Sequence, residues 1–393
     1  MPGPVELAPE QLDLRRWIRP GDGVVVGQCC AEPVPLVDAL AAQALDLGHV
    51  RVFAGMCFRD ALAVDGLEVW SYGGLGRTGR IPGLRVVPAH FSALPRLFAR
   101  GGLPGDVALI QVAPPDPAGR CSLGVGVDYL ADALAHARVV VAEVNARCPR
   151  TEEAWVPWER LDAAVHTDRP LLEAPRALPG SIEERIAGHV AGLVRPGDAI
   201  QLGVGALPEA ILGALRQHRG LRVHSGMVTD GILGLMEAGA VAGPAITGAA
   251  LGSARLFGAL DAGADIVFRP VSVTHAPATL AALGRLCAIN SALEVDLHGQ
   301  VGAETVAGRT VGAIGGQVDF LRAAMSSGGC GIIAVPAARI VARLSGPVTT
   351  ARADVDWVVT EHGARRLSDL DAAGRTAALR ELAGADRAGD LVV

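Results

Sequence analysis

Short apolar runs alternate with amphipathic segments along most of this chain. Residues 18–56 and 194–227 both carry Arg-Pro-Gly-Asp after their first residue, a turn sequence that ends one element and leads into the next. In each, an apolar strand, a glycine-containing loop, a helix with a proline near its first turn and a second strand ending in Gly-Met then follow. This order predicts a parallel crossover unit. Its recurrence predicts that the chain uses the unit twice.

The remaining apolar runs extend the same pattern. Residues 106–112 and 139–144 read as buried strands on either side of a helical segment at 127–137, and residues 264–268 and 331–336 read as further strands. We therefore predict an α/β fold of two similar open-sheet domains, 1–178 and 179–393. The Pro-rich stretch near 174–184 is the expected linker.

Composition narrows the classes of protein that remain. Half of the 393 residues are hydrophobic, so two full-sized cores are expected. A net charge of −6 argues against general nucleic-acid binding, and the lack of lysine excludes a lysine Schiff base. No apolar run resembles a signal peptide or a membrane span, so we expect a cytoplasmic protein. The seven cysteines contain no CxxC pair and predict no metal site, and Cys29-Cys30 reads as two small buried hydrophobes.

The stretch 289–322 combines a strand-like alternation with a series of glycines. Residues 292–297 alternate, and residues 318–321 are suited to begin a helix. A strand, a Gly-Gly turn and a helix start together make an anion or oxyanion site, although an ordinary glycine-rich loop has the same pattern. The glycines are Gly299, Gly302, Gly308, Gly312, Gly315 and Gly316.

Several motifs in a fixed order carry a resemblance to a known family. They are Pro114-Pro-Asp116, Gly119, Cys121-Ser-Leu-Gly124, Val127-Asp-Tyr129, Glu143-Val-Asn145, Pro149-Arg-Thr151, Asn290-Ser-Ala-Leu-Glu-Val-Asp296, Gly299-Gln-Val301, Ile314-Gly-Gly-Gln-Val-Asp-Phe320 and Val355-Asp-Trp-Val-Val-Thr-Glu-His-Gly363. On these residues the chain resembles the acetyl-CoA hydrolase/transferase family, which includes 4-hydroxybutyrate and succinyl-CoA:acetate CoA-transferases. The resemblance covers roughly residues 18–370. The tail after Gly363 looks short beside the family's C-terminal helix.

The resemblance implies a ping-pong reaction. Acyl-CoA binds between two domains, a glutamate attacks the thioester, and the resulting glutamyl-CoA thioester passes its CoA to a second carboxylate. The N–H groups of Gly315 and Gly316 would stabilise the oxyanion. The resemblance also implies that coenzyme A enters as the acyl-CoA substrate and that no metal is needed. It further implies that the chain forms a homodimer or a larger homo-oligomer. The residues expected to contact CoA are Gly203, Gly205, Ala206, Ile211, Asn290 and Gln317.

The chain departs from the family at the nucleophile. The family's glutamate segment reads HSEM or HTEM, whereas this chain reads His224-Ser-Gly-Met227, so Gly226 stands where the glutamate belongs. Glycine has no side chain, so no anhydride can form there. His275 takes a position at which the family often has asparagine. His224 and His275 are therefore candidate general bases, because histidine suits proton transfer near neutral pH.

A substitute carboxylate is the alternative to a missing nucleophile. Glu209 lies on the first turn of the second unit's helix and could enter the site, or could simply complement the helix dipole. Glu294 and Asp296 read as structural. Three hypotheses follow: an acyl-CoA enzyme that transfers the acyl group directly to water, a hydroxyl or an amine; a CoA-transferase that uses a substitute carboxylate such as Glu209; and a non-catalytic acyl-CoA binder or subunit.

Overall fold

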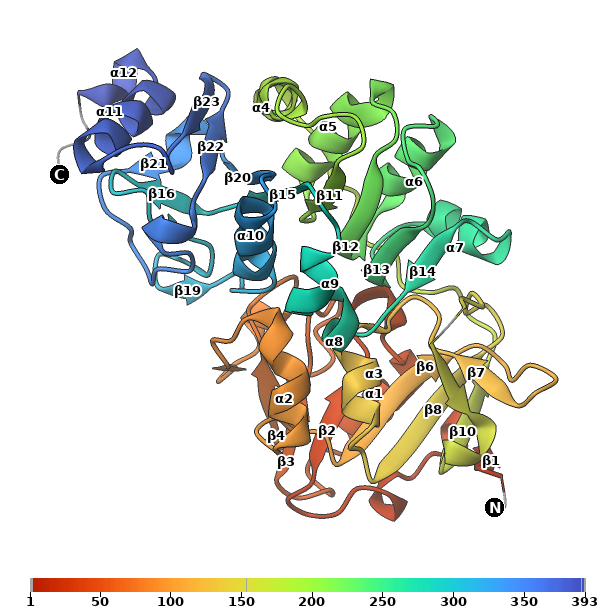
Figure 1. Cartoon of the computed structure of the whole chain (residues 1–393). Helices are drawn as coiled ribbons and strands as arrows, with labels where there is room; N and C mark the ends of the chain where they lie inside the picture. Colours follow the sequence, from red (N-terminus) through yellow and green to blue (C-terminus); the bar gives the residue numbers. More distant parts are fainter. Residues whose placement is uncertain (1–2, 153, 390, 392–393) are drawn as a thin grey trace. The chain divides into compact units, whose positions relative to one another are not determined.

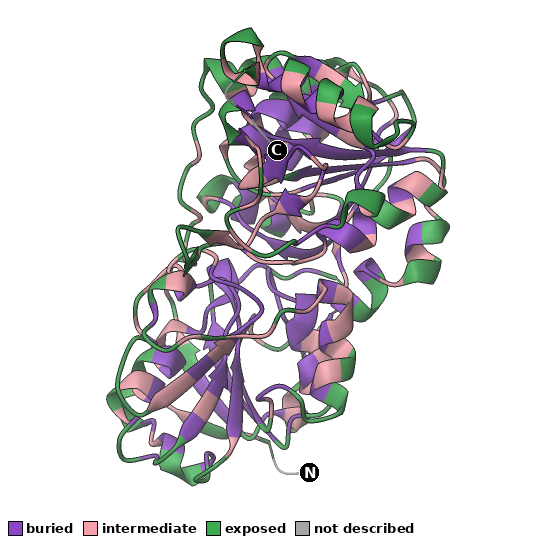
Figure 2. Cartoon of the chain, turned by 90° about the vertical axis from the view of Figure 1, so that its left-hand side faces the viewer, coloured by how far each residue is buried: buried purple, intermediate pink, exposed green. Residues whose placement is uncertain are grey.

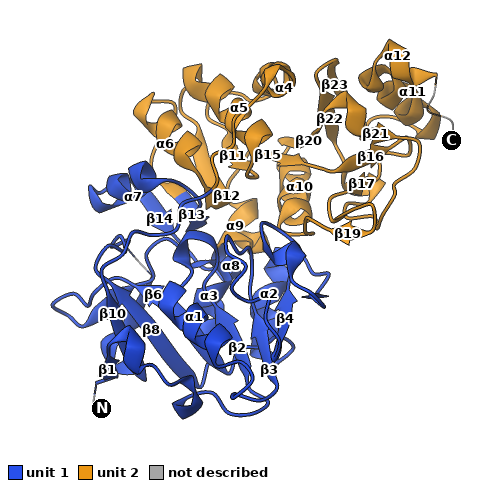
Figure 3. Cartoon of the chain, turned by 180° about the vertical axis from the view of Figure 1, so that it is seen from behind, with its two compact units in different colours: residues 1–174, 246–273 blue, residues 175–245, 274–393 orange. Residues whose placement is uncertain are grey.

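The computed structural model describes residues 3–152, 154–389 and 391, and the chain divides into two compact units (Figure 3). Unit 1 comprises residues 1–174 and 246–273, and unit 2 comprises 175–245 and 274–393. Each unit has its own large, mainly parallel sheet with helices, which confirms the predicted α/β class. Residues 246–273 belong to unit 1, so each unit is made of two segments that are separated in the sequence. The division into domains at residue 178 stays a prediction.

Unit 1 is built on an eight-stranded sheet in the order β1-β10-β8-β6-β2-β3-β4-β5, and every pair in it is parallel. Its strands are β1 (Val5–Leu7), β2 (Gly23–Val26), β3 (Val50–Phe53), β4 (Leu67–Ser71), β5 (Arg85–Val86), β6 (Val107–Val112), β8 (Val139–Asn145) and β10 (Ala163–Thr167). The other elements of this unit are α1 (Val34–Ala42), α2 (Leu94–Ala99), α3 (Asp128–Leu134), the short strands β7 (Arg120–Ser122) and β9 (Trp155–Pro157), then β13 (Ala245–Ala250), α7 (Ala254–Asp261) and β14 (Ile266–Phe268).

Burial explains why the central strands could be recognised from sequence. Every residue of β6 and β8 is buried, because other elements cover both faces of a parallel sheet. Their sequences are therefore continuous apolar runs rather than alternating ones. Buried residues follow the strands, and exposed ones gather on the outer faces of the helices (Figure 2).

Within unit 2, strands pair in the order β12-β11-β15-β20-β22-β23, and the pair β22–β23 is antiparallel. The elements appear along the chain in Figure 1. They are α4 (Ser181–Ala191), β11 (Ala199–Leu202), α5 (Ala206–Ala214), β12 (Arg222–Val228), α6 (Asp230–Glu237), α8 (Val271–Thr274, at the junction), α9 (Pro277–Ala281), β15 (Leu286–Ser291), β16 (Glu294–Asp296), β17 (Val301–Gly302), β18 (Thr305–Val306), β19 (Arg309–Thr310), α10 (Gln317–Ser326), β20 (Cys330–Ala334), β21 (Ile340–Val341), β22 (Trp357–Thr360), β23 (Gly363–Arg366), α11 (Ala372–Ala383) and α12 (Ala385–Ala388).

The repeated sequence unit folds in the same way in both places. β2, α1 and β3 form a strand–helix–strand unit with parallel strands, and so do β11, α5 and β12. In each case the first strand also pairs on its other side with a later parallel strand, β6 for β2 and β15 for β11. The duplication predicted from Arg-Pro-Gly-Asp is confirmed at the level of topology.

The glycine-rich stretch contains two small antiparallel pairs before it enters a helix. β16 pairs with β17, and β18 pairs with β19 across Ala307 and Gly308, whose φ angles are 49° and 74°. Two successive positive φ angles are the signature of a type I′ hairpin turn. Gly315 then turns the chain with φ of 57°, and α10 begins at Gln317. The predicted helix is confirmed. The Ala/Arg-rich tail, expected to be short, contains the twelve-residue helix α11.

No helix in the described residues is both long and apolar enough to cross a membrane.

Candidate active site

Gly226, the predicted nucleophile position, lies in β12 at intermediate exposure. Its φ is not positive, so the backbone there is open to any L-residue. A Cβ placed on Gly226 would lie 3.2 Å from Cε1 and 3.4 Å from Nε2 of His275. Apart from the two chain neighbours of Gly226, no other heavy atom of the described residues would lie within 4 Å. The space beside Gly226 is therefore bounded by the imidazole of His275.

The same imidazole also lies against Gly316. A Cβ on Gly316 would overlap Nε2 of His275 and would lie 2.8 Å from its Cδ2. The ring packs edge-on against Phe320, with 4.8 Å between ring centroids at an interplanar angle of 67°. His275 thus lies between β12, which carries the predicted nucleophile position, and the glycine turn predicted as the oxyanion site. The structure brings these three predicted residues together.

Burial controls the protonation of His275. The side chain is 2% exposed, and burial, helped by the neighbouring His224, lowers the pKa of His275 to about 3. The imidazole is therefore neutral near pH 7. Its Nδ1 lies 2.9 Å from the Thr274 hydroxyl, and Nε2 is the ring nitrogen nearer Gly316.

His224, the second candidate base, has its Nε2 engaged. It lies 2.8 Å from the carbonyl oxygen of Thr274, so Nε2 carries the proton and donates it. The side chain is 3% exposed, and burial lowers the pKa of His224 as well. This hydrogen bond holds the residue just before His275. In this arrangement His224 helps to position His275 through the backbone of Thr274.

Glu209, the candidate substitute nucleophile, faces the start of another helix. Its carboxylate accepts a short hydrogen bond from the hydroxyl of Thr229, the N-cap residue of α6, and a Cβ on Gly231 would lie 2.6 Å from Glu209 Oε2. Burial raises the pKa of Glu209, and the bond from Thr229 opposes this. No Glu209 atom comes within 4 Å of the Cβ position at Gly226. The structure does not bring Glu209 together with Gly226.

Gly315 and Gly316 form the turn that leads into α10. Gly316 is the N-cap residue of this ten-residue helix, and both glycines have intermediate exposure. The first N–H groups of a helix have no carbonyl partner one turn earlier and favour negative charge. The turn therefore has the polarity required of an oxyanion site.

The six residues predicted to contact CoA fall into two groups. Gly203, Gly205 and Ala206 make the partly exposed turn from β11 into α5, and Gly205 has φ of 121°, which strongly favours glycine. Ile211, Asn290 and Gln317 are 0%, 7% and 8% exposed. Their contact with CoA stays a prediction.

Two polar partners in this region were not expected from sequence. The amide of Asn290 on β15 exchanges hydrogen bonds of 3.1 and 3.3 Å with Gln201 on β11, and Gln317 donates to Thr350 at 2.8 Å. Phe320 was expected only as a helix residue, yet its ring packs against His275. Its place one turn after Gly316 is the signal that could have suggested this contact.

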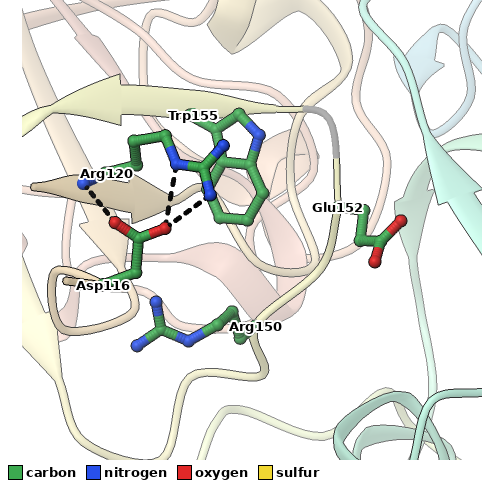
Figure 4. A pocket seen from close by; sticks show the side chains of 5 residues that line it. All are labelled: Asp116, Arg120, Arg150, Glu152 and Trp155. Carbon is green, nitrogen blue, oxygen red and sulfur yellow. Dashed lines mark hydrogen bonds and ion pairs between the residues drawn. The ribbon is translucent and has the colours of Figure 1, made fainter. Parts of the chain in front are cut away.

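A separate hollow lies on unit 1. It has a volume of about 400 Å³ and is lined by Asp116, Arg120, Arg150, Glu152 and Trp155 (Figure 4). Arg120 is bound by Asp116, and its guanidinium lies 4.7 Å from the centroid of Trp155. The two basic side chains are matched by two acidic ones. No residue predicted for the acyl-CoA site lines this hollow.

Comparison with known proteins confirms the family. Residues 80–171 match the acetyl-CoA hydrolase/transferase N-terminal domain and residues 252–392 match its C-terminal domain. The chain belongs to the acetyl-CoA hydrolase/transferase family.

Individual relatives are similar over most of their length. A 4-hydroxybutyrate coenzyme A transferase of Clostridium kluyveri is 34% identical over 85% of this chain and 79% of its own. The crystal structure of RipA from Yersinia pestis is 30% identical with a TM-score of 0.92, covering 98% of this chain and 96% of that one. A 4-hydroxybutyrate CoA-transferase structure from Porphyromonas gingivalis is 32% identical with a TM-score of 0.83 at the same coverage.

Proposed function

We propose that this protein is an acyl-CoA enzyme that moves the acyl group from the thioester directly to water, a hydroxyl or an amine. One observation carries the proposal: the imidazole of His275 lies against Gly226, where the family's nucleophile is missing, and against Gly316 of the predicted oxyanion turn. The predicted proton acceptor and the predicted oxyanion turn thus lie side by side, at the position where the resemblance leads us to expect a glutamate and the chain has glycine.

The proposed reaction has a single acyl-transfer step. The acceptor X–H attacks the thioester carbon, and the N–H groups of Gly315 and Gly316 stabilise the negative oxygen. His275 Nε2 takes the proton of X–H as the new bond forms. The C–S bond then breaks, and the proton passes from His275 to the sulfur of the departing CoA. In the tautomer that this step requires, Nδ1 carries the proton and donates to the Thr274 hydroxyl 2.9 Å away, and Nε2 acts as the proton acceptor. A pKa of about 3 makes His275 a weak base, so it assists during attack instead of deprotonating the acceptor beforehand.

The backbone at Gly226 supports this reading. If Gly226 had a positive φ, the backbone conformation alone would explain why a glycine stands there. Its φ is not positive, so the backbone does not require glycine. Its counterpart in unit 1, Gly55, is different, because a Cβ there would collide with the side chain of Gln28. Packing requires the glycine in unit 1. In unit 2 a Cβ on the glycine would meet the His275 ring at 3.2 Å without overlapping it.

A second candidate is a CoA-transferase that uses another carboxylate. The similar proteins favour it, since they include a succinyl-CoA:cyclohexane-1-carboxylate CoA transferase of Geobacter metallireducens, 34% identical over 78% of this chain. Glu209 would have to leave Thr229 to act as this nucleophile.

Mass spectrometry distinguishes the candidates. The protein is incubated with acyl-CoA, with and without borohydride, and release of free CoA is followed in parallel. Direct transfer predicts CoA release with no adduct. A CoA adduct, or a reduced glutamyl residue, would establish the substitute-carboxylate mechanism. Binding of acyl-CoA with no turnover towards water, alcohols, amines or carboxylates would make the protein a binder and overturn the proposal.

A further inference from the structure

Two buried cysteines face each other across adjacent strands of unit 2. Cys287 on β15 and Cys330 on β20 are direct partners in the parallel register, so their side chains lie on the same face of the sheet. Neighbouring strands are about 4.8 Å apart, which falls within the Cα separation of about 4.4–6.8 Å that a disulfide spans. Both cysteines are free thiols in the structure. A disulfide here requires little backbone movement.

An ion pair flanks the two sulfurs. Arg285 Nη2 donates to Cys330 Sγ at 3.3 Å, and Arg285 Nε lies 2.9 Å from Asp198 Oδ1. Asp198 Oδ2 in turn accepts from Cys287 Sγ at 3.2 Å. One thiol therefore faces a cation and the other faces a carboxylate. This asymmetry suits a reactive thiolate on Cys330 and a protonated thiol on Cys287.

The other charged groups near Cys330 do not reverse this asymmetry. Asp356, just before β22, opposes a negative charge on Cys330, but its Oδ1 accepts from Arg366 at 2.8 Å. The neighbouring thiol of Cys287 and the charge of Arg285 lower the pKa of Cys330, while the pKa of Cys287 is raised. By contrast, burial raises the pKa of Cys57 to about 12.

We propose that Cys330 and Cys287 are a reversible oxidation site, in which Cys330 reacts with a peroxide and Cys287 resolves the product into a disulfide. The Cys330 thiolate attacks one peroxide oxygen, the O–O bond breaks, and the departing hydroxide leaves as water after taking a proton. Cys287 then attacks the sulfenic sulfur, the S–O bond breaks, and a second water leaves. Two thiols and one hydrogen peroxide thus give one disulfide and two waters. Asp198 is placed to receive the Cys287 proton.

This site is separate from the candidate active site. Cys287 and Cys330 lie in the first two residues of β15 and β20, whereas Asn290 lies near the carboxyl end of β15. The inference does not rest on the acyl-transfer proposal. It would hold equally for a non-catalytic acyl-CoA binder.

Peptide mapping of the full-length protein tests the site. After treatment with equimolar hydrogen peroxide, trypsin cuts only at arginine, because the chain has no lysine. Cys287 then lies in peptide 286–309 and Cys330 in peptide 323–339, each with no other cysteine. We expect these two peptides to become disulfide-linked first and to separate on reduction. Oxidation of other cysteines while this pair stays reduced would overturn the proposal.

Variants separate the roles of the three side chains. In Cys287→Ser, Cys330 should stop at a sulfenic acid that dimedone traps. In wild type, alkylation of Cys330 by iodoacetamide should level off at a lower pH than alkylation of an ordinary thiol, whose pKa is about 8.5. Arg285→Leu should move this inflection upward and Arg285→Lys should largely keep it. An inflection that is the same in Arg285→Leu and wild type would contradict the assigned role of Arg285.

Discussion

At the scale of single residues, His275 links the two glycines that matter most to the proposed chemistry. Replacing Gly316 by alanine tests this contact, because the added Cβ would overlap the imidazole. His275 must move, or the turn that presents the oxyanion donors must open. Loss of one such donor typically lowers the rate on the order of 10²–10³-fold, and we expect a loss of this size in CoA release from acyl-CoA.

Gly213 provides the matched control for this substitution. It lies in α5, is exposed, and has no heavy atom within 4 Å of its Cβ position. Gly213→Ala should therefore leave turnover unchanged. If a folded Gly316→Ala protein keeps full turnover, the oxyanion turn is assigned to the wrong place.

The protonation of His275 makes a second prediction, about stability and pH. Because its pKa in the folded state is about 3 and its unfolded value is 6.5, the unfolded chain binds a proton that the folded chain does not between these two values. Above pH 6.5 the imidazole is neutral in both states, so keeping it neutral has no effect on the free energy of unfolding. As the pH falls below 6.5, the free energy of unfolding decreases. Between pH 7 and pH 5 the loss is about 2 kcal/mol.

Urea denaturation of wild type and His275→Asn at several pH values measures this effect. The variant cannot titrate at this position, so its free energy of unfolding should fall by about 2 kcal/mol less over that range. Other buried groups, such as Asp128, are common to both proteins and cancel in the comparison. Parallel pH curves for the two proteins would show that His275 is accessible to protons in the folded state.

At the scale of elements, the repeated strand–helix–strand unit makes a third prediction. Gly55 follows β3, and a Cβ there would lie 2.7 Å from Cδ of Gln28, whose Oε1 accepts from Met56 N and the Tyr72 hydroxyl. Gly55→Ala should therefore lower the free energy of unfolding by about 1–3 kcal/mol, through overpacking and strained hydrogen bonds. Gly226→Ala has no restriction on φ, and its Cβ would approach the His275 ring to 3.2 Å without overlap, so the loss should be smaller than for Gly55→Ala.

Chemical denaturation of both alanine variants decides whether the two glycines differ in this way. Equal, large losses would mean that Gly226 is required by the fold. The missing glutamate would then have a structural cause.

The repeated unit also shows what a sequence can predict about elements. The strands of 106–112 and 139–144 were recognisable because burial on both faces leaves only apolar residues. Helix α11 was not, because its Ala/Arg-rich sequence has no strong apolar stripe, although Leu379 and Leu382 are buried. The helix is stabilised by burial of Leu379 and Leu382 in the core of unit 2, which the local sequence pattern does not reveal.

At the scale of the whole molecule, the fold and family followed from motif order, whereas the arrangement of the site did not. Gly226, His275 and Gly316 belong to separate elements, and only tertiary packing determines that one imidazole contacts both glycines. The same holds for Glu209. Its position on the first turn of α5 was readable, but its bond to Thr229 depends on how α5 and α6 pack.

A glutamate at position 226 should give this fold CoA-transferase activity only if the side chain has room beside residue 275. Gly226→Glu alone should suppress direct transfer without creating a CoA-transferase, because the new side chain starts 3.2 Å from the His275 ring. Adding His275→Asn makes room, since asparagine is smaller and keeps a hydrogen-bond donor. We expect the double variant to form a CoA adduct on incubation with acyl-CoA, detected by intact mass, and to transfer CoA to a small carboxylate.

The matched control is Gly226→Gln with His275→Asn, which has nearly the same shape without a nucleophilic carboxylate. It should fold equally well and form no adduct. An adduct in the glutamate variant alone would place position 226 within reach of the thioester carbon, with the oxyanion turn still functional. If both double variants fold, bind acyl-CoA and show no adduct, then position 226 does not face the reacting carbon, and the absence of glutamate there cannot be the reason for direct transfer.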